Sequence, residues 1–218
     1  MCWGIYYSAS GGENYVYGNE IVVNKIDTSS KALAAAFYIC GGPKYFGGQF
    51  YDNRITTNIP AAWLASFYGG ASNSKIYNNT IIPLNHAKFK TFRIGSLGCD
   101  ECVAKNIEFR SNEIKGQAFD MAVTDQDHSY TVYWTLKVKV SDSKGAPLKN
   151  TEVTILDKNN APFLQTKTDE LGKLKIELPE YSVNSKEKKI SSPYKISIGD
   201  YKKEVVLNSN KEVSCVIN

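Results

Sequence analysis

The amino-acid sequence predicts an all-β protein, and three observations carry this prediction. Tyrosine (14 residues) and glycine (16 residues) are abundant, and Asn, Ile and Val are also plentiful. Strong helix formers cluster only between residues 31 and 36. Aromatic and β-branched residues favour strands, whereas Gly and Asn favour the turns that join them.

A change in amino-acid composition near Ser129 indicates two domains. Before it the sequence is rich in Gly, Asn, Ala and aromatic residues, and after it apolar and charged residues alternate. We place the joint near residues 125–131 and expect domains at 1–128 and 129–218. The N-terminal stretch lacks the basic and apolar segments of a signal peptide and reads like the middle of a strand-rich domain, so we expect a fragment or trimmed chain.

Charge and hydropathy exclude two classes of partner. The net charge of +4 is modest, and basic residues are scattered apart from the Lys186–Lys189 run, which suits a solvated loop. We therefore expect no nucleic-acid partner. No run of 18 or more apolar residues occurs, so we expect no membrane insertion.

The first domain contains a repeat of the form apolar-x-x-Asn-x-Ile. Its four copies are VYGNEI, FYDNRI, IYNNTI and FRSNEI. The uneven spacings of 34, 26 and 33 residues suit a solenoid whose coils differ in loop length. We expect each Asn to turn the chain in the left-handed conformation and each Ile to start the next buried strand. The repeated asparagines are Asn19, Asn53, Asn79 and Asn112.

A second apolar stretch lies upstream of each repeated Asn. It precedes a glycine pair in IYYSASGG, FYICGG and SFYGG, whereas the fourth copy is FRIGSLG and a fifth is FDMAV. Each turn therefore reads as a strand, a Gly-rich loop, a strand, a tight Asn corner and a strand.

These repeats resemble the coils of right-handed parallel β-helices in the pectate-lyase-like superfamily. The resemblance covers roughly residues 3–125 and implies about four to five coils. It also implies that the repeated asparagines stack at one corner and hydrogen-bond to one another. Members of this superfamily bind extended polysaccharides along an exposed sheet, so the resemblance implies a polysaccharide partner.

The second domain alternates apolar and charged residues in six or seven short segments. Turn sequences such as SKGAP, KNNAP and DELGK separate them, at the density of a β-sandwich. The run from KVSDSKGAP to KLKIEL resembles carboxypeptidase-regulatory-like and transthyretin-like modules. This resemblance implies an Ig-like or transthyretin-like β-sandwich that acts as a spacer or docking platform.

Strand alternation predicts an outward row on the first domain. Its aromatic planes and Arg93 suit a sugar and its carboxylate, whereas the alternative is that stacked tyrosines only stabilise the sheet. The row consists of Tyr6, Tyr38, Ser66, Arg93 and Asp120, with Tyr68 and Cys40 one step further along. The predicted substrate-binding residues are Tyr6, Tyr38, Ser66, Tyr68 and Arg93.

Catalysis is a second interpretation of the residues around this outward row. β-Helix lyases use a Lys or Arg base and a cation for the uronate carboxylate, so the resemblance implies Arg93 or Lys90 as base with Asp120 nearby. The alternative is that these residues are exposed loop charges at the edges of the coils.

Metal and cofactor sites are not expected. Cys99 and Cys102 form a lone CxxC, and only two histidines, His86 and His128, accompany it, so zinc lacks ligands. Few acidic residues fall on the outward row, so a Ca²⁺ cluster is unsupported. The two cysteines are either a local disulfide in a secreted protein or two free thiols.

The sequence therefore predicts a secreted or cell-surface protein that binds or cleaves polysaccharide, as a lyase or glycoside hydrolase if it is an enzyme. One alternative is a structural or adhesive protein whose β-helix is a non-catalytic stalk. Another is a fragment of a larger β-helix enzyme whose catalytic coils are missing. The sequence predicts neither the substrate nor the oligomeric state.

Overall fold

A computed structural model describes residues 2–8, 13–26, 34–41, 47–66 and 69–217. These residues form strands and a single 3₁₀ turn (η1, Leu84–His86), and none of them is α-helical, which confirms the all-β class. None of the helical structure in the described ranges is long and apolar enough to cross a membrane.

The chain forms two compact units, each described separately below. Unit 1 comprises residues 1–131 with 183–188, and unit 2 comprises residues 132–182 with 189–218. The sequence-based boundary between residues 128 and 129 lies three residues earlier and did not anticipate that residues 183–188 belong with unit 1.

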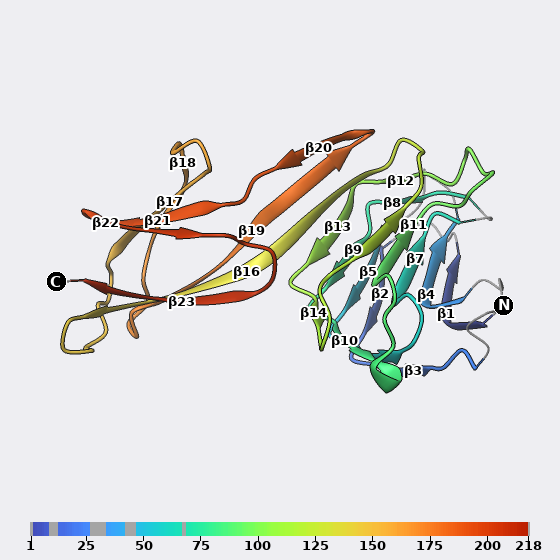
Figure 1. The fold of residues 1–218 in the computed structure, drawn as a ribbon, viewed down its shortest axis with the longest axis horizontal. Coiled ribbons are helices and arrows are strands. Elements are labelled where there is room, and N and C mark those ends of the chain that lie inside the picture. Colours follow the sequence, from blue (N-terminus) through green and yellow to red (C-terminus); the bar gives the residue numbers. More distant parts are fainter. Residues whose placement is uncertain (1, 9–12, 27–33, 42–46, 67–68, 218) are drawn as a thin grey trace. The chain divides into compact units, whose positions relative to one another are not determined.

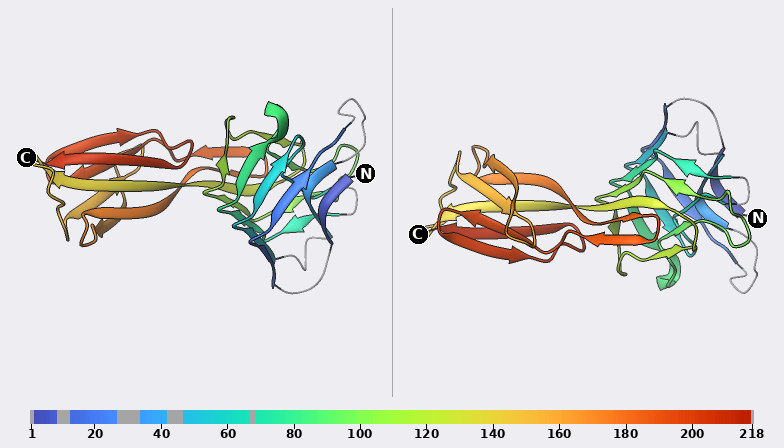
Figure 2. Two further views of the ribbon diagram at one scale, coloured as in Figure 1. Left: turned by 90° about the horizontal axis from the view of Figure 1, so that it is seen from below. Right: turned by 90° about the horizontal axis from the view of Figure 1, so that it is seen from above.

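Unit 1 is built from parallel sheets whose strands come from successive turns of the chain (Figures 1 and 2). Sheet one runs β1 (Cys2–Ser8), β4 (Ala34–Cys40), β7 (Ala62–Leu64), β11 (Phe92–Ile94) and β15 (Met121–Val123). Sheet two runs β2 (Glu13–Tyr17), β5 (Gly47–Tyr51), β9 (Lys75–Tyr77) and β13 (Ile107–Arg110), followed by the start of β16 (Ser129–Asp142). Sheet three runs β3 (Glu20–Val23), β6 (Arg54–Thr57), β10 (Thr80–Pro83) and β14 (Glu113–Ile114), and β8 (Ala71–Ser72) pairs with β12 (Ala104–Lys105).

The repeat places equivalent residues in register, which forms the core of unit 1. The first apolar position of each copy stacks in sheet two, where Phe50, Ile76 and Phe109 are almost fully buried. The isoleucine of each copy stacks in sheet three, where Ile55 and Ile81 are buried. Because side chains alternate along a strand, these positions all point inward.

The repeated asparagines form a hydrogen-bonded ladder at the corner between sheets two and three. Asn19 donates its backbone N–H and Nδ2 to Asn53 Oδ1, at 3.1 and 2.9 Å. Asn53 donates in the same way to Asn79, and Asn79 to Asn112. Each amide thus satisfies polar groups of the neighbouring repeat, as buried polar groups require.

The left-handed residue at this corner is not the ladder asparagine itself, contrary to the sequence-based expectation. It is the residue before each one, with φ between 51° and 66°. The asparagine itself does not have a positive φ, and its side-chain amide bonds to the next asparagine of the stack. The left-handed residues are Gly18, Asp52, Asn78 and Ser111.

Unit 2 contains a four-stranded antiparallel sheet and a second group of strands. The sheet runs β18 (Pro162–Lys167), β17 (Glu152–Leu156), β21 (Tyr194–Ile198) and β22 (Tyr201–Val205). The second group contains β16, which pairs in parallel with β23 (Lys211–Ile217), together with β19 (Lys173–Asn184) and β20 (Glu187–Ile190). Leu136, Val138, Val153, Ile155, Leu178, Tyr194, Ile196 and Cys215 are buried.

Three turns of unit 2 use the same local chemistry. Asp142, Asp157 and Asp169 each accept backbone N–H groups from the residues two and four positions later. The residue three positions after each aspartate has a positive φ, which Gly or Asn tolerates best. This explains why the turn sequences SKGAP, KNNAP and DELGK separate strands.

Candidate functional site

The outer face of sheet one carries a different row from the one predicted. Strand register aligns Tyr6 with Tyr38, Tyr38 with Trp63, Trp63 with Arg93, and Arg93 with Ala122. Trp63 and Ala122 therefore stand where Ser66 and Asp120 were predicted.

Alignment on the glycine pairs caused the error at Ser66, whereas the segment that contains Asp120, FDMAV, has no glycine pair. Trp63 lies six residues before Gly69, whereas Tyr38 lies only three residues before Gly41, so the third repeat carries three extra residues. Strand β7 ends at Leu64, the next residue Ala65 has a left-handed φ of 53°, and Ser66 lies beyond it. Asp120 precedes β15 by one residue and lies level with Thr91 rather than with Arg93.

The middle of this row is closed to a ligand. Tyr38 and Trp63 are 0% and 1% exposed, and Ser66 is also fully buried. Tyr38 stacks on Tyr6 at 5.4 Å and meets Trp63 edge-on at 5.8 Å between ring centroids. Of the predicted sugar-stacking tyrosines, only Tyr6 is exposed at 45%, and Tyr68 lies outside the described residues.

Arg93 is a half-buried cation held over an indole. Its guanidinium carbon lies 4.1 Å from the Trp63 ring centroid, within cation–π range. The Trp63 Nε1 donates to the Gly95 carbonyl oxygen at 2.9 Å, which fixes the ring. Burial lowers the pKa of the Arg93 guanidinium from its ordinary value. No carboxylate of a described residue forms an ion pair with it.

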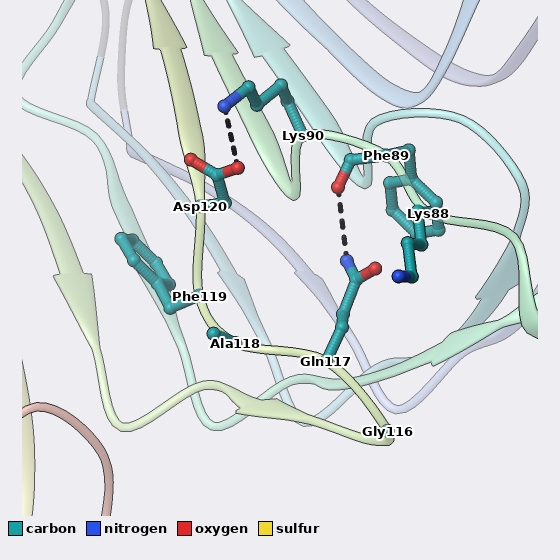
Figure 3. Close-up of a pocket in the computed structure, with 8 residues that line it drawn as sticks. All are labelled: Lys88, Phe89, Lys90, Gly116, Gln117, Ala118, Phe119 and Asp120. Carbon is teal, nitrogen blue, oxygen red and sulfur yellow. Dashed lines mark hydrogen bonds and ion pairs between the residues drawn. The ribbon is translucent and has the colours of Figure 1, made fainter.

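A shallow cavity of about 640 Å³ opens beside the end of this row (Figure 3). Lys90 Nζ lies 2.6 Å from Asp120 Oδ2, and Gln117 Nε2 donates to the Phe89 carbonyl oxygen at 3.2 Å. The structure thus brings together Lys90 and Asp120, two of the residues predicted from the sequence. The lining residues are Lys88, Phe89, Lys90, Gly116, Gln117, Ala118, Phe119 and Asp120.

Arg93 does not line the cavity, but it lies close to the lining residues along the chain. Arg93 follows Lys90 by three residues, and its strand partner Ala122 follows Asp120 by two. Arg93 and Ala122 are register partners in β11 and β15, so their side chains point to the same side of sheet one. The short side chain of Ala122 leaves the flank of Arg93 opposite Trp63 without a large neighbour in β15.

The geometry favours binding over proton abstraction. Lys90 Nζ forms an ion pair with the Asp120 carboxylate, and both side chains are about half exposed. A protonated lysine has no lone pair with which to remove a proton. The predicted catalytic roles of Arg93, Lys90 and Asp120 stay a prediction.

A second aromatic array, on sheet two, was missed by the sequence reading. Tyr17, Tyr51 and Tyr77 stack with ring centroids 5.0 and 4.7 Å apart and planes within 7°. Arg110 occupies the equivalent position in β13. The repeat contained the evidence for this array, because its second position is Tyr in the first three copies and Arg in the fourth.

No group of three or more His, Cys, Asp or Glu residues that could hold a metal ion occurs within the described ranges. Cys99 and Cys102 are joined in a disulfide, so the CxxC sulfurs are not free thiolates. The structure thereby selects the disulfide from the two alternatives that the sequence left open.

His128 is buried at the last coil, 1% exposed, and is fully hydrogen-bonded. Its Nδ1 accepts the Ala104 backbone N–H at 3.0 Å, and its Nε2 lies 3.0 Å from Thr124 Oγ1. Thr124 Oγ1 itself donates to the Ile94 carbonyl oxygen, so the ring proton belongs on Nε2. Burial, helped by the nearby charge of Lys105, lowers the pKa of His128 to about 4.

Comparisons with known proteins give little further information. No known protein family and no characterised protein matches the sequence. Among solved structures, "The Bacillus anthracis TIE protein" is similar at 19% sequence identity with a TM-score of 0.30. That match covers 44% of this chain and only 19% of the other, and at this TM-score it supports no inference about fold or function.

Proposed function

We propose that this chain is an extracytoplasmic carbohydrate-binding protein that recognises an acidic polysaccharide. In this proposal unit 1 is a right-handed parallel β-helix, which carries the binding site. Unit 2 is an Ig-like or transthyretin-like β-sandwich, which acts as a spacer or docking platform.

The parallel sheets and the corner ladder support the β-helix. Strands of three sheets follow one another in the order of the chain, and each pairs in parallel with its equivalent in the next coil. Connections between parallel strands are almost always right-handed, which supports the proposed hand. The antiparallel sheet of β18, β17, β21 and β22 and the parallel pair β16 and β23 support the sandwich.

The observation that carries the proposed function is the state of Arg93. A half-buried guanidinium without a carboxylate partner among the described residues is costly, because charge removed from water needs a counter-charge. A sugar carboxylate would supply that charge and accept two parallel N–H bonds from the guanidinium.

The cavity, whose lining residues directly precede β11 and β15, offers the remaining chemistry of a saccharide site. Lys88 has no carboxylate partner among the described residues and adds a second cation. Phe89 and Phe119 offer apolar faces for a sugar ring. Gln117, Lys90 and Asp120 offer donors and acceptors for hydroxyl groups.

The Cys99–Cys102 disulfide supports a location outside the cytoplasm. Structural disulfides persist in oxidising compartments such as the cell exterior and the periplasm. This agrees with a polysaccharide as partner.

Binding to an array of acidic and neutral polysaccharides tests the proposal. We expect retention on carboxylated polymers and little on neutral ones, and Arg93→Lys should weaken binding about 10- to 100-fold through loss of the two-pronged contact. Arg54→Gln is the matched control, because Arg54 is an exposed arginine on sheet three that pairs with Glu20. Absence of binding to every polymer, or equal losses in both variants, would contradict the proposal.

A non-catalytic stalk is the second candidate, supported by the burial of Tyr38 and Ser66. In a stalk the stacked aromatics only stabilise neighbouring coils. The polysaccharide array distinguishes the two proposals. A stalk is folded and stable but binds no polysaccharide on the array.

A further inference from the structure

The connection that follows β11, residues 95–103, begins two residues after Arg93 and contacts its neighbours closely. Its first residue, Gly95, donates its backbone N–H to the Leu64 carbonyl oxygen at 2.9 Å. The Gly95 carbonyl oxygen accepts the Trp63 indole N–H at 2.9 Å. Because the Trp63 ring lies against the Arg93 guanidinium, the position of this connection affects where Arg93 can lie.

Gln126 holds two points of this connection together. Its Nε2 donates to the Ser96 carbonyl oxygen at 3.0 Å and to the Cys99 carbonyl oxygen at 3.1 Å. Ser96 directly follows Gly95 in the chain. One amide side chain thus anchors the backbone next to the carbonyl group that accepts the Trp63 indole N–H.

The Cys99–Cys102 disulfide fixes the far end of the same connection. Cys102 is fully buried, and its backbone N–H donates to the Cys99 carbonyl oxygen at 3.2 Å. The Cys102 sulfur lies 3.0 Å from the Ser66 carbonyl oxygen. Ser66 follows Trp63 by three residues, so the disulfide lies against the segment that carries Trp63.

The side-chain amide of Gln126 is satisfied on one side only. Its Oε1 is buried and accepts no hydrogen bond within the part of the chain that the structure describes. A buried acceptor without a donor is destabilising. Because the two donated bonds are kept despite this cost, they indicate a role for Gln126 beyond stability.

We propose that Gln126 and the Cys99–Cys102 disulfide are positioning residues for carboxylate binding at Arg93, an inference that rests on the proposed function. Together they hold the Gly95 carbonyl oxygen, which fixes the Trp63 ring. The ring in turn holds the Arg93 guanidinium in one orientation, ready to donate two parallel N–H bonds to a carboxylate. A guanidinium that is already oriented loses less conformational freedom on binding.

Calorimetric titration of the full chain tests the role of Gln126. It uses the carboxylated polymer that the array retains, for example polygalacturonate, and the same polymer with its carboxyl groups reduced. Gln126→Met keeps the length of the side chain but removes its donors. We expect it to weaken binding of the acidic polymer roughly 3- to 10-fold, because apparent affinity falls with the fraction of molecules in which Arg93 is correctly oriented.

Gln165→Met is the matched control for this titration. Gln165 lies in β18 of unit 2, where its Nε2 donates to Glu152. This variant also loses a hydrogen bond of a glutamine side chain, but far along the chain from Arg93. We expect it to bind both polymers as the unmodified chain does.

A double-mutant cycle separates positioning from a general loss of structure. In the Arg93→Lys background, Gln126→Met should have little further effect on binding, because the group that it positions is no longer present. Equal losses of affinity in both backgrounds, or an equal loss for the carboxyl-reduced polymer, would overturn the proposal.

Hydrogen exchange of the Trp63 indole N–H, followed by NMR, supplies a readout without polysaccharide. We expect Gln126→Met and the double variant Cys99→Ser/Cys102→Ser each to speed this exchange about 10-fold or more, and Gln165→Met to leave it unchanged. Binding of the acidic polymer together with unchanged exchange in both test variants would overturn the positioning role alone. Faster exchange in a chain that binds no polymer would instead overturn the proposed function.

Discussion

Protonation of His128 should destabilise unit 1 in mild acid. The imidazole is buried, its Nδ1 accepts the Ala104 backbone N–H, and its pKa falls from 6.5 to about 4 in the folded chain. A proton on Nδ1 would place two N–H groups face to face and leave a charge without water. The unfolded chain therefore binds this proton more readily than the folded chain between pH 6.5 and pH 4.

The size of the effect follows from the shift in pKa. Stability is fully present above the unfolded pKa of 6.5 and declines as the pH falls, since the unfolded state gains the proton first. At 1.36 kcal/mol per pKa unit, the total loss by pH 4 is about 3 kcal/mol, and roughly 2 kcal/mol of it is lost by pH 5.

Urea unfolding at pH 7.5 and at pH 5.0 measures this loss of stability. Hydrogen exchange of the Ala104 backbone amide at the same two pH values measures it at the site. His128→Asn keeps an oxygen that can accept the Ala104 N–H but does not titrate. We expect this variant to be less stable overall, because the smaller side chain leaves a gap, yet nearly independent of pH over this interval. His86→Gln is the matched control, because the sequence contains only these two histidines. If His128→Asn keeps the acid sensitivity, or His86→Gln removes it, the reasoning about His128 is wrong.

Three further predictions concern the structure of unit 1. Asn53→Ala removes three ladder hydrogen bonds and one to the Val16 carbonyl oxygen, and should cost roughly 2–4 kcal/mol in urea unfolding. Gly95→Ala should cost roughly 3 kcal/mol or more, because Gly95 has a φ of 83° and an added Cβ would lie 1.7 Å from Thr124 Oγ1. Cys40 is buried and its pKa is raised by burial, so alkylation at pH 8, followed by mass spectrometry, should modify it only after unfolding.

The two stability predictions each have a control in the same chain. Asn208→Ala, at an exposed position of unit 2, should change stability by less than about 0.5 kcal/mol. Gly98→Ala, at a φ of 74° with no atom within 4 Å of the added Cβ, should cost only about 1–2 kcal/mol of backbone strain. Equal losses in test and control variants, or rapid alkylation of folded Cys40, would contradict the packing described for unit 1.

The repeat positions of unit 1 could be read from the sequence because they depend on local chemistry. A residue that turns the chain, an amide that bonds to the next coil and an apolar side chain beside it recur at each corner. The asparagine ladder therefore follows from four short segments. The one error at this corner was to assign the left-handed conformation to the asparagine and not to the residue before it. The preceding residues include Gly18, Asp52 and Ser111, which share no residue type that would reveal the turn.

The outward row of sheet one could not be read in the same way, because its register depends on loop length. Three extra residues in the third coil place Trp63, not Ser66, beside Arg93. Burial of Tyr38 was also hidden from the sequence, since strand alternation tells which side a residue faces but not what covers that side. The pairing of Lys90 with Asp120 was accessible, because both lie just before equivalent strands of neighbouring coils.

The central claim is recognition of a carboxylate by Arg93, and one calorimetric comparison tests it most directly. The full chain is titrated with an acidic polysaccharide found on the array and with the same polymer after its carboxyl groups are reduced to alcohols. Recognition by Arg93 predicts that reduction and Arg93→Lys each weaken binding about 10- to 100-fold, and that reduction has little further effect on the Arg93→Lys variant. Equal affinity for the acidic and reduced polymers would contradict the claim.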